Sequence, residues 1–91
     1  MVDDNWQVSE KMQVPIIYAE AVIGPNGARI DYIRRASRSS ILINDLEGGA
    51  MSIEINGSSA TDVQTAEQLI KVTVTSLRNL LLVMLINIII F

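Results

Sequence analysis

Cysteine and histidine are both absent from the 91 residues of this chain. Without cysteine there is no disulfide, no thiolate zinc site and no cysteine nucleophile, which fits a reducing intracellular compartment. Without histidine the chain lacks the commonest general base and the commonest metal ligand. Because the Ser-His-Asp and HExxH constellations cannot be built, we expect neither a catalytic metal nor another cofactor.

Carboxylate pairs are the remaining route to acid–base chemistry, and they are sparse. Asp45 and Glu47 form the only close acidic pair in the middle of the chain, beside the Gly48-Gly49 turn. Acidic residues at such a turn are typical of a solvated loop. We therefore predict that the protein is not an enzyme.

Aromatic residues and positive charge are also limited. Aromatic residues make up 4% of the chain, so a platform on which bases stack is not the expected binding mode. The net charge of −3 argues against strong, nonspecific binding to nucleic acid. Four of the seven basic residues nevertheless fall within ten positions, opposed there only by Asp31: Arg29, Arg34, Arg35 and Arg38. From charge alone, this cluster is either a solvated helix face or a binding face.

The pattern of apolar residues predicts three strands and three helices in the order β-α-α-β-β-α. Strands are expected over 11–16, 41–44 and 51–56, and helices over 18–23, over 28–37 and from Ser59 or Thr61 to 70. Strict alternation in 51–56 predicts a strand with one buried face, paired antiparallel with 41–44. The expected fold class is α+β, with helices on one face of a small three-stranded sheet.

The sequence Gly24-Pro25-Asn26-Gly27 separates the first two predicted helices. Two glycines three positions apart allow a tight turn that a sugar-phosphate backbone can approach closely. The second helix directs the partial positive charge and free N–H groups of its N-terminus to the same place. This arrangement predicts a nucleic-acid clamp.

The stretch from Val22 to Arg34 reads V-I-G-P-N-G-A-R-I-D-Y-I-R. It resembles the core motif of type I KH domains, roughly V-I-G-x-x-G-x-x-I-x-x-I-R, with every fixed position filled. The predicted strands and the last helix also match the order of elements in this family. The amino-acid sequence around the loop is similar to the last KH domain of plant multi-KH RNA-binding proteins. The resemblance implies a flexible lead at 1–10, a KH domain at 11–72 and an apolar extension at 73–91.

The resemblance implies binding of single-stranded RNA, with single-stranded DNA as a further ligand, in post-transcriptional regulation. KH domains hold about four nucleotides in a groove beside the G-x-x-G loop; the variable loop, here 45–50, forms the other wall. The implied RNA-binding residues are Ala21, Val22, Ile23, Gly24, Pro25, Asn26, Gly27, Ile30, Arg34, Ile41 and Ile43. A purely structural alternative stays open for the isoleucines, since Ile30, Ile33, Ile41 and Ile43 also suit the core.

Three positions depart from the family. Pro25 and Asn26 stand where many active loops carry Lys or Arg, and Pro25 has no backbone N–H. Fewer phosphate contacts predict weaker binding with a flatter salt dependence. Arg38 stands where the family often has glycine at the helix end, and Met51 where some relatives have a basic residue.

The last twelve residues, 80–91, are apolar except for Asn87. As a helix they span about 18 Å, short of the roughly 30 Å hydrocarbon core of a bilayer, so a membrane is the less favoured partner. The alternatives are an aggregation-prone strand, an extension of the third helix that docks on a partner, and the product of truncation or alternative splicing. The alternative function is a KH scaffold used for contacts with proteins or membranes through this tail.

The expected partners are therefore single-stranded RNA and, beyond it, other KH domains or proteins. The expected location is intracellular, in the nucleus, the cytoplasm or both.

Overall fold

The alternating run from 50 to 57 forms the central strand of a three-stranded sheet. The structure, a computed structural model, describes residues 7–90, apart from the side chains of 45–47. Its strands are β1 (Val8–Pro15), β2 (Ser40–Glu47) and β3 (Ala50–Gly57), in the spatial order β1-β3-β2 with both pairings antiparallel. Along β3, half-buried and buried residues alternate without exception, which confirms the predicted one-sided burial.

The first strand is longer than predicted. It begins at Val8, and the segment from Val8 to Glu10 pairs with the segment from Ile55 to Gly57 of β3. This part of the predicted lead is therefore β-strand, and residues 1–6 of the lead lie outside the described residues. The strand ends at Pro15, because proline cannot donate to a sheet ladder.

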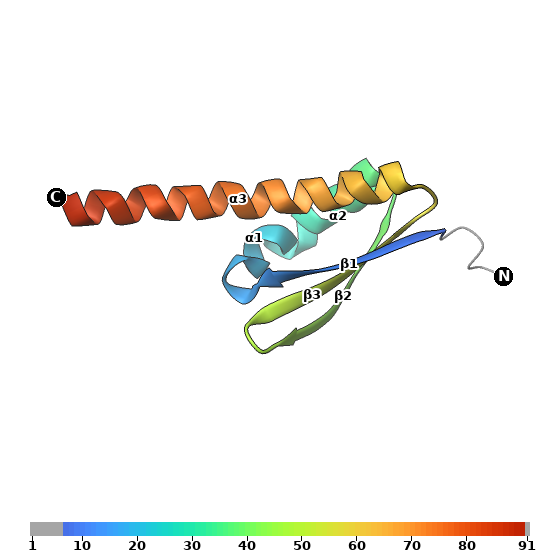
Figure 1. Cartoon of the computed structure of the whole chain (residues 1–91), viewed down its shortest axis with the longest axis horizontal. Helices are drawn as coiled ribbons and strands as arrows, with labels where there is room; N and C mark the ends of the chain where they lie inside the picture. Colours follow the sequence, from blue (N-terminus) through green and yellow to red (C-terminus); the bar gives the residue numbers. More distant parts are fainter. Residues whose placement is uncertain (1–6, 91) are drawn as a thin grey trace.

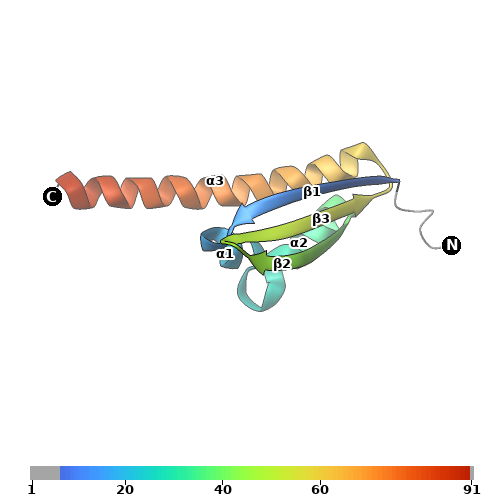
Figure 2. The ribbon, with the colours of Figure 1, turned by 60° about the horizontal axis from the view of Figure 1, so that its bottom comes forward.

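Three α-helices cover one face of the sheet (Figure 1). In Figure 2 the sheet lies in front of the helices. After the short 3₁₀ turn η2 (Ile16–Tyr18) come α1 (Ala19–Ile23), the turn η3 (Pro25–Gly27) and α2 (Ala28–Ser37). The third helix, α3 (Ala60–Ile90), is capped by Ser59, whose Oγ accepts a hydrogen bond from the N–H of Asp62 at 3.2 Å. The predicted α+β order is confirmed, but α3 runs twenty residues beyond its predicted end at 70.

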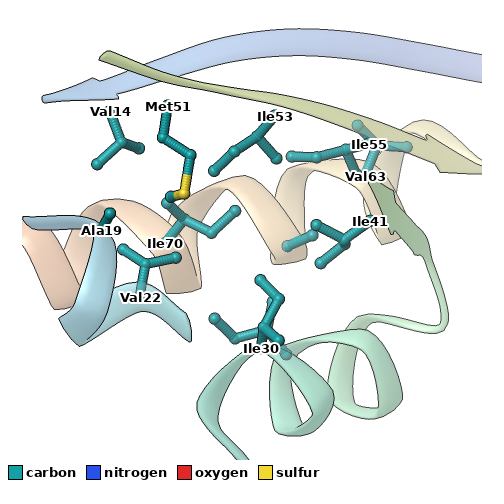
Figure 3. Close-up of a cluster of buried hydrophobic side chains, with 12 residues drawn as sticks. Val14, Ala19, Val22, Ile30, Ile41, Met51, Ile53, Ile55, Val63 and Ile70 are labelled. Carbon is teal, nitrogen blue, oxygen red and sulfur yellow. The ribbon is translucent and has the colours of Figure 1, made fainter. Parts of the chain in front are cut away.

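The core lies between the sheet and the helices (Figure 3). It consists of twelve buried apolar residues: Val14, Ala19, Val22, Ile30, Ile33, Ile41, Met51, Ile53, Ile55, Val63, Ala66 and Ile70. In α2 the polar residue Ser37 is also buried, whereas Ala36 before it is exposed. The Ser37 hydroxyl donates to the carbonyl oxygen of Ile33 at 2.6 Å, so its polar group is satisfied inside the helix.

The helix α3 has two unlike halves. Its buried residues, Val63, Ala66 and Ile70, all lie in the first half. Val63 and Ile70 lie between the helix and the sheet (Figure 3). Every residue from Arg78 to Ile90 is exposed. The helix projects well past the body (Figure 1), which gives the molecule extents of 59 × 25 × 22 Å.

Candidate nucleic-acid interface

The Gly24–Gly27 turn joins α1 to α2 with an unusual backbone. Gly24 has φ 79° and ψ 169°, Asn26 has φ 55° and Gly27 has φ 77°. Positive φ strongly disfavours most side chains; glycine adopts it freely and asparagine more readily than most residues. The residue types at these three positions are therefore those that the turn itself requires.

The two glycines have different surroundings. A Cβ built on Gly24 would lie 2.6 Å from both the backbone N and the Cβ of Arg29, so the close approach at Gly24 is made by the chain's own helix α2. A Cβ on Gly27 would meet nothing within 4 Å. Of the two, Gly27 is the glycine with open space in which a ligand backbone can lie.

The start of α2 offers fewer free donors than the sequence suggested. The N–H of Gly27 donates to the carbonyl oxygen of Gly24 at 3.1 Å, and the N–H of Ala28 donates to that of Pro25. These donors are satisfied within the turn. The exposed side-chain amide of Asn26 can donate to a ligand.

A depression of about 410 Å³ adjoins the loop. Its lining residues are Glu20, Ile23, Gly24 and Pro25. Glu20 is not among the predicted site residues, although its place on α1, one turn before Gly24, was the available signal. The depression combines an apolar wall from Ile23 with a carboxylate at its edge.

The structure divides the apolar residues among the predicted RNA-binding residues into two groups. Val22, Ile30 and Ile41 are 0%, 3% and 1% exposed, so their side chains are core and present no surface to a ligand. The Val22 side chain points into the core (Figure 3), so it is not available for the RNA contact that the resemblance implied. Ile23 and Ile43 pack against the core but remain half-buried, and they supply the accessible apolar atoms. Ala21 is also half-buried.

Arg34 connects α2 to the edge strand β2. Its Nε and Nη2 donate to the carbonyl oxygen of Ile41 at 3.2 and 2.8 Å, and its Nη1 contacts Asp31 Oδ1 at 2.8 Å. Asp31, the acidic residue within the arginine cluster, is thus paired with Arg34. The Arg34 side chain is still 39% exposed, and two of its five N–H donors remain for a ligand.

The other arginines of the cluster have separate roles. Arg29 turns away from the loop toward α3, where Nε and Nη2 donate to Thr73 Oγ1 at 3.2 and 2.9 Å. Its guanidinium also lies 5.3 Å from the centre of the Tyr32 ring. Arg35 and Arg38 are exposed, and Arg38 ends α2 with φ 56°. Of the four arginines, Arg34 is therefore the one that the structure fixes across α2 and β2.

The predicted variable loop at 45–50 is a tight hairpin. β2 continues to Glu47 and β3 begins at Ala50, so only Gly48 and Gly49 lie between the strands. Both have positive φ, 62° and 81°, as the favoured two-residue hairpin turns with two left-handed residues require. The carbonyl oxygen of Gly49 accepts a hydrogen bond from Ile16 N at 2.8 Å. The loop that the resemblance implied as the second wall is therefore a short turn, hydrogen-bonded to the residue that follows β1.

Among the described residues there is no group of three or more acidic side chains that could hold a metal ion.

Comparison with known proteins agrees with this architecture. Residues 9–72 match the KH domain family. The chain is 48% identical over 66 residues to the RNA-binding KH domain-containing protein PEPPER of Arabidopsis thaliana. That match covers 71% of this chain but only 13% of the length of that relative. The solution structure of the first type I KH domain of human vigilin superimposes with a TM-score of 0.64 at 18% identity, covering 81% of this chain and 80% of that one.

Proposed function

Since the chain belongs to the KH domain family, we propose that it is a single-stranded RNA-binding module that holds about four nucleotides beside the Gly24–Gly27 loop. The observation that carries the proposal is the juxtaposition of two features. The turn leaves open space at Gly27, and Arg34 lies across α2 and β2 with donors to spare. The first admits a phosphate backbone, and the second can hydrogen-bond a base or a phosphate.

The sugar-phosphate backbone would lie against Gly27, with the Asn26 amide donating to a phosphate oxygen. No positive side chain in the loop assists this contact, because its variable positions are Pro25 and Asn26. The grip on the backbone thus depends on close approach and on the dipole of α2, a helix of ten residues whose N-terminus faces the loop.

The bases would lie on the accessible atoms of Ile23 and Ile43. Because β2 is an edge strand, the backbone groups on its outer side have no strand partner and can pair with the edges of bases. One of those groups, the carbonyl oxygen of Ile41, is already held by Arg34. Recognition therefore relies on base edges and apolar contact more than on phosphate charge. We extend the proposal to post-transcriptional RNA regulation inside the cell.

Fluorescence anisotropy with labelled octanucleotide pools tests the proposal. Replacing Pro25 and Asn26 together with aspartate places two negative charges where the phosphates would lie. We expect RNA affinity to fall by at least about tenfold through like-charge repulsion. The matched control is Gln64→Asp with Gln68→Asp, the same charge change on exposed positions of α3.

Circular dichroism must show that both variants fold. RNA binding that is equal in the loop variant and the control would remove the loop from the mechanism. A DNA pool in parallel measures whether the groove distinguishes the two nucleic acids.

A further inference from the structure

From Leu80 to Ile90 the projecting half of α3 presents an apolar surface in which Asn87 is the one polar side chain. Its large apolar side chains are all exposed, by between 38% and 74%: Leu80, Leu81, Leu82, Val83, Met84, Leu85, Ile86, Ile88, Ile89 and Ile90. An 18-residue stretch of α3 has a mean hydropathy of 1.9, and none of it is buried. Contiguous exposed apolar surface of this kind marks a site of interaction. The question is what covers it.

The distribution of these residues around the helix selects the partner. Seven consecutive apolar residues, from Leu80 to Ile86, point in every direction around the axis, since a helix turns once in 3.6 residues. A helix that docks in a protein groove or in a coiled coil needs only one apolar stripe and keeps its opposite face polar. A helix that is apolar on all sides suits surroundings that are apolar on all sides, which lipid hydrocarbon provides.

Charge along the chain favours a lipid surface as well. The last acidic residue is Glu67, and residues 68–91 contain Lys71 and Arg78 as their only charged side chains. This segment is therefore positive in a chain whose net charge is −3. Arg78 is exposed at the point where α3 leaves the body and the apolar run begins. A cation at the start of an apolar helix suits the headgroup region of an anionic membrane.

We propose that residues 79–90 of α3 insert into a lipid bilayer, with Arg78 at the level of the headgroups. These twelve residues extend about 18 Å, enough to cross the hydrocarbon of one leaflet, about half of the roughly 30 Å core. The helix is too short to cross the whole hydrocarbon core, which is why the sequence disfavoured a membrane. Insertion into one leaflet does not require a full crossing. Up to its last turn, whose four carbonyl groups have no partner within the helix, the helix satisfies its own backbone hydrogen bonds, as hydrocarbon demands.

The residues proposed to insert include none of the residues of the candidate RNA groove. The projecting half extends past α1, away from the end of the body where β1 begins (Figure 1), while the Gly24–Gly27 turn belongs to the body. The same chain can then hold RNA while attached to a membrane. This inference does not depend on RNA binding, and it goes beyond the proposed function.

Flotation of the full chain with phosphatidylcholine vesicles, with and without phosphatidylserine, tests the proposal. We expect the native chain to float with the vesicles, and Leu82→Asp with Ile86→Asp to lower its partition by at least about a hundredfold. The matched control, Gln64→Asp with Gln68→Asp, has the same charge change and spacing on the first half of α3 and should float like the native chain. Arg78→Gln should lower partition into the anionic vesicles alone, by about fivefold.

Three outcomes would overturn the proposal. The native chain could stay with the aqueous fraction, the Leu82 and Ile86 variant could float as well as the control, or the native chain could avoid vesicles while forming oligomers that the variant loses. The last result would assign the surface to a second copy of the chain. RNA affinity of the Leu82 and Ile86 variant should equal that of the native chain, so failure of this proposal and failure of the proposed function give different results.

Discussion

Alanine at Gly24 should destabilise the domain more than alanine at Gly27, although both glycines have positive φ. The φ angles are 79° and 77°, so the sign of φ alone does not separate them. Two other properties do. Gly24 has ψ 169°, in a region that is essentially restricted to glycine, while Gly27 has ψ 13°, in the left-handed helical region. A Cβ at Gly24 also meets the backbone of Arg29 at 2.6 Å, whereas a Cβ at Gly27 meets open space.

The expected costs follow from these surroundings. Alanine in the left-handed helical region costs roughly 1–2 kcal/mol, which is the expected effect of Gly27→Ala. Gly24→Ala carries about 1–3 kcal/mol of backbone strain and, from overpacking, a further 1–3 kcal/mol, because the group in the way is the backbone of α2. The free energy of unfolding of a domain of this size is about 5–10 kcal/mol, so Gly24→Ala removes a large share of the stability.

Urea unfolding followed by circular dichroism measures both variants, with the shift in midpoint at constant slope taken as the change in stability. RNA affinity then separates the roles of the glycines. Gly27→Ala should remain folded yet bind RNA less well, because its methyl group enters the space proposed for the ligand backbone. Equal destabilisation by the two variants would refute the argument that α2 packs against Gly24. Unchanged RNA affinity in folded Gly27→Ala would refute the assignment of that space to the ligand.

Two further predictions concern the arginines of α2. Arg38→Gly should stabilise the domain by about 1 kcal/mol, since Arg38 has φ 56° at the helix end and glycine adopts that conformation without a steric cost; an unchanged thermal midpoint would contradict this. Arg34→Gln should cost about 1 kcal/mol of stability, because the hydrogen bonds to Ile41 O are only partly buried, and should weaken RNA binding severalfold. Its control is Arg35→Gln, which removes the same charge from an exposed position, and equal effects of the two on stability would exclude the link to β2.

The order of elements could be predicted because each element carries its own local signal. Alternation predicted β3, and the glycines predicted the turn between α1 and α2. Two hydroxyl residues, Ser59 and Thr61, were predicted as alternative starts of α3, and Ser59 is the cap. These signals act over a few residues and depend on backbone geometry. The resemblance to KH domains then predicted how these elements are arranged, in one sheet with helices on one face.

Features that depend on distant contacts were not predictable. Arg29 is 44 positions from Thr73, and nothing local to either residue indicates their hydrogen bonds. The split of the isoleucines into core and accessible groups likewise depends on how the helices lie on the sheet. The length of α3 was left open between alternatives for another reason: a run that is apolar at every position has no period from which helix could be distinguished from strand.

The placement of charge in the candidate site determines what kind of RNA ligand it can favour. The loop has no cation, Arg29 is bound to Thr73, and Glu20 adds a carboxylate beside the turn. For a protein that binds a single strand, each phosphate neutralised adds about 0.7 to the magnitude of the slope of log affinity against log salt concentration. A site with Arg34 as its fixed cation should therefore show a slope of about 0.7 in magnitude. Binding that is so weakly electrostatic must derive its free energy from contacts with the bases, along β2 and on Ile23 and Ile43. RNA affinity should therefore change more between RNA sequences than between salt concentrations. A larger change with salt than with sequence would indicate that phosphate contacts dominate.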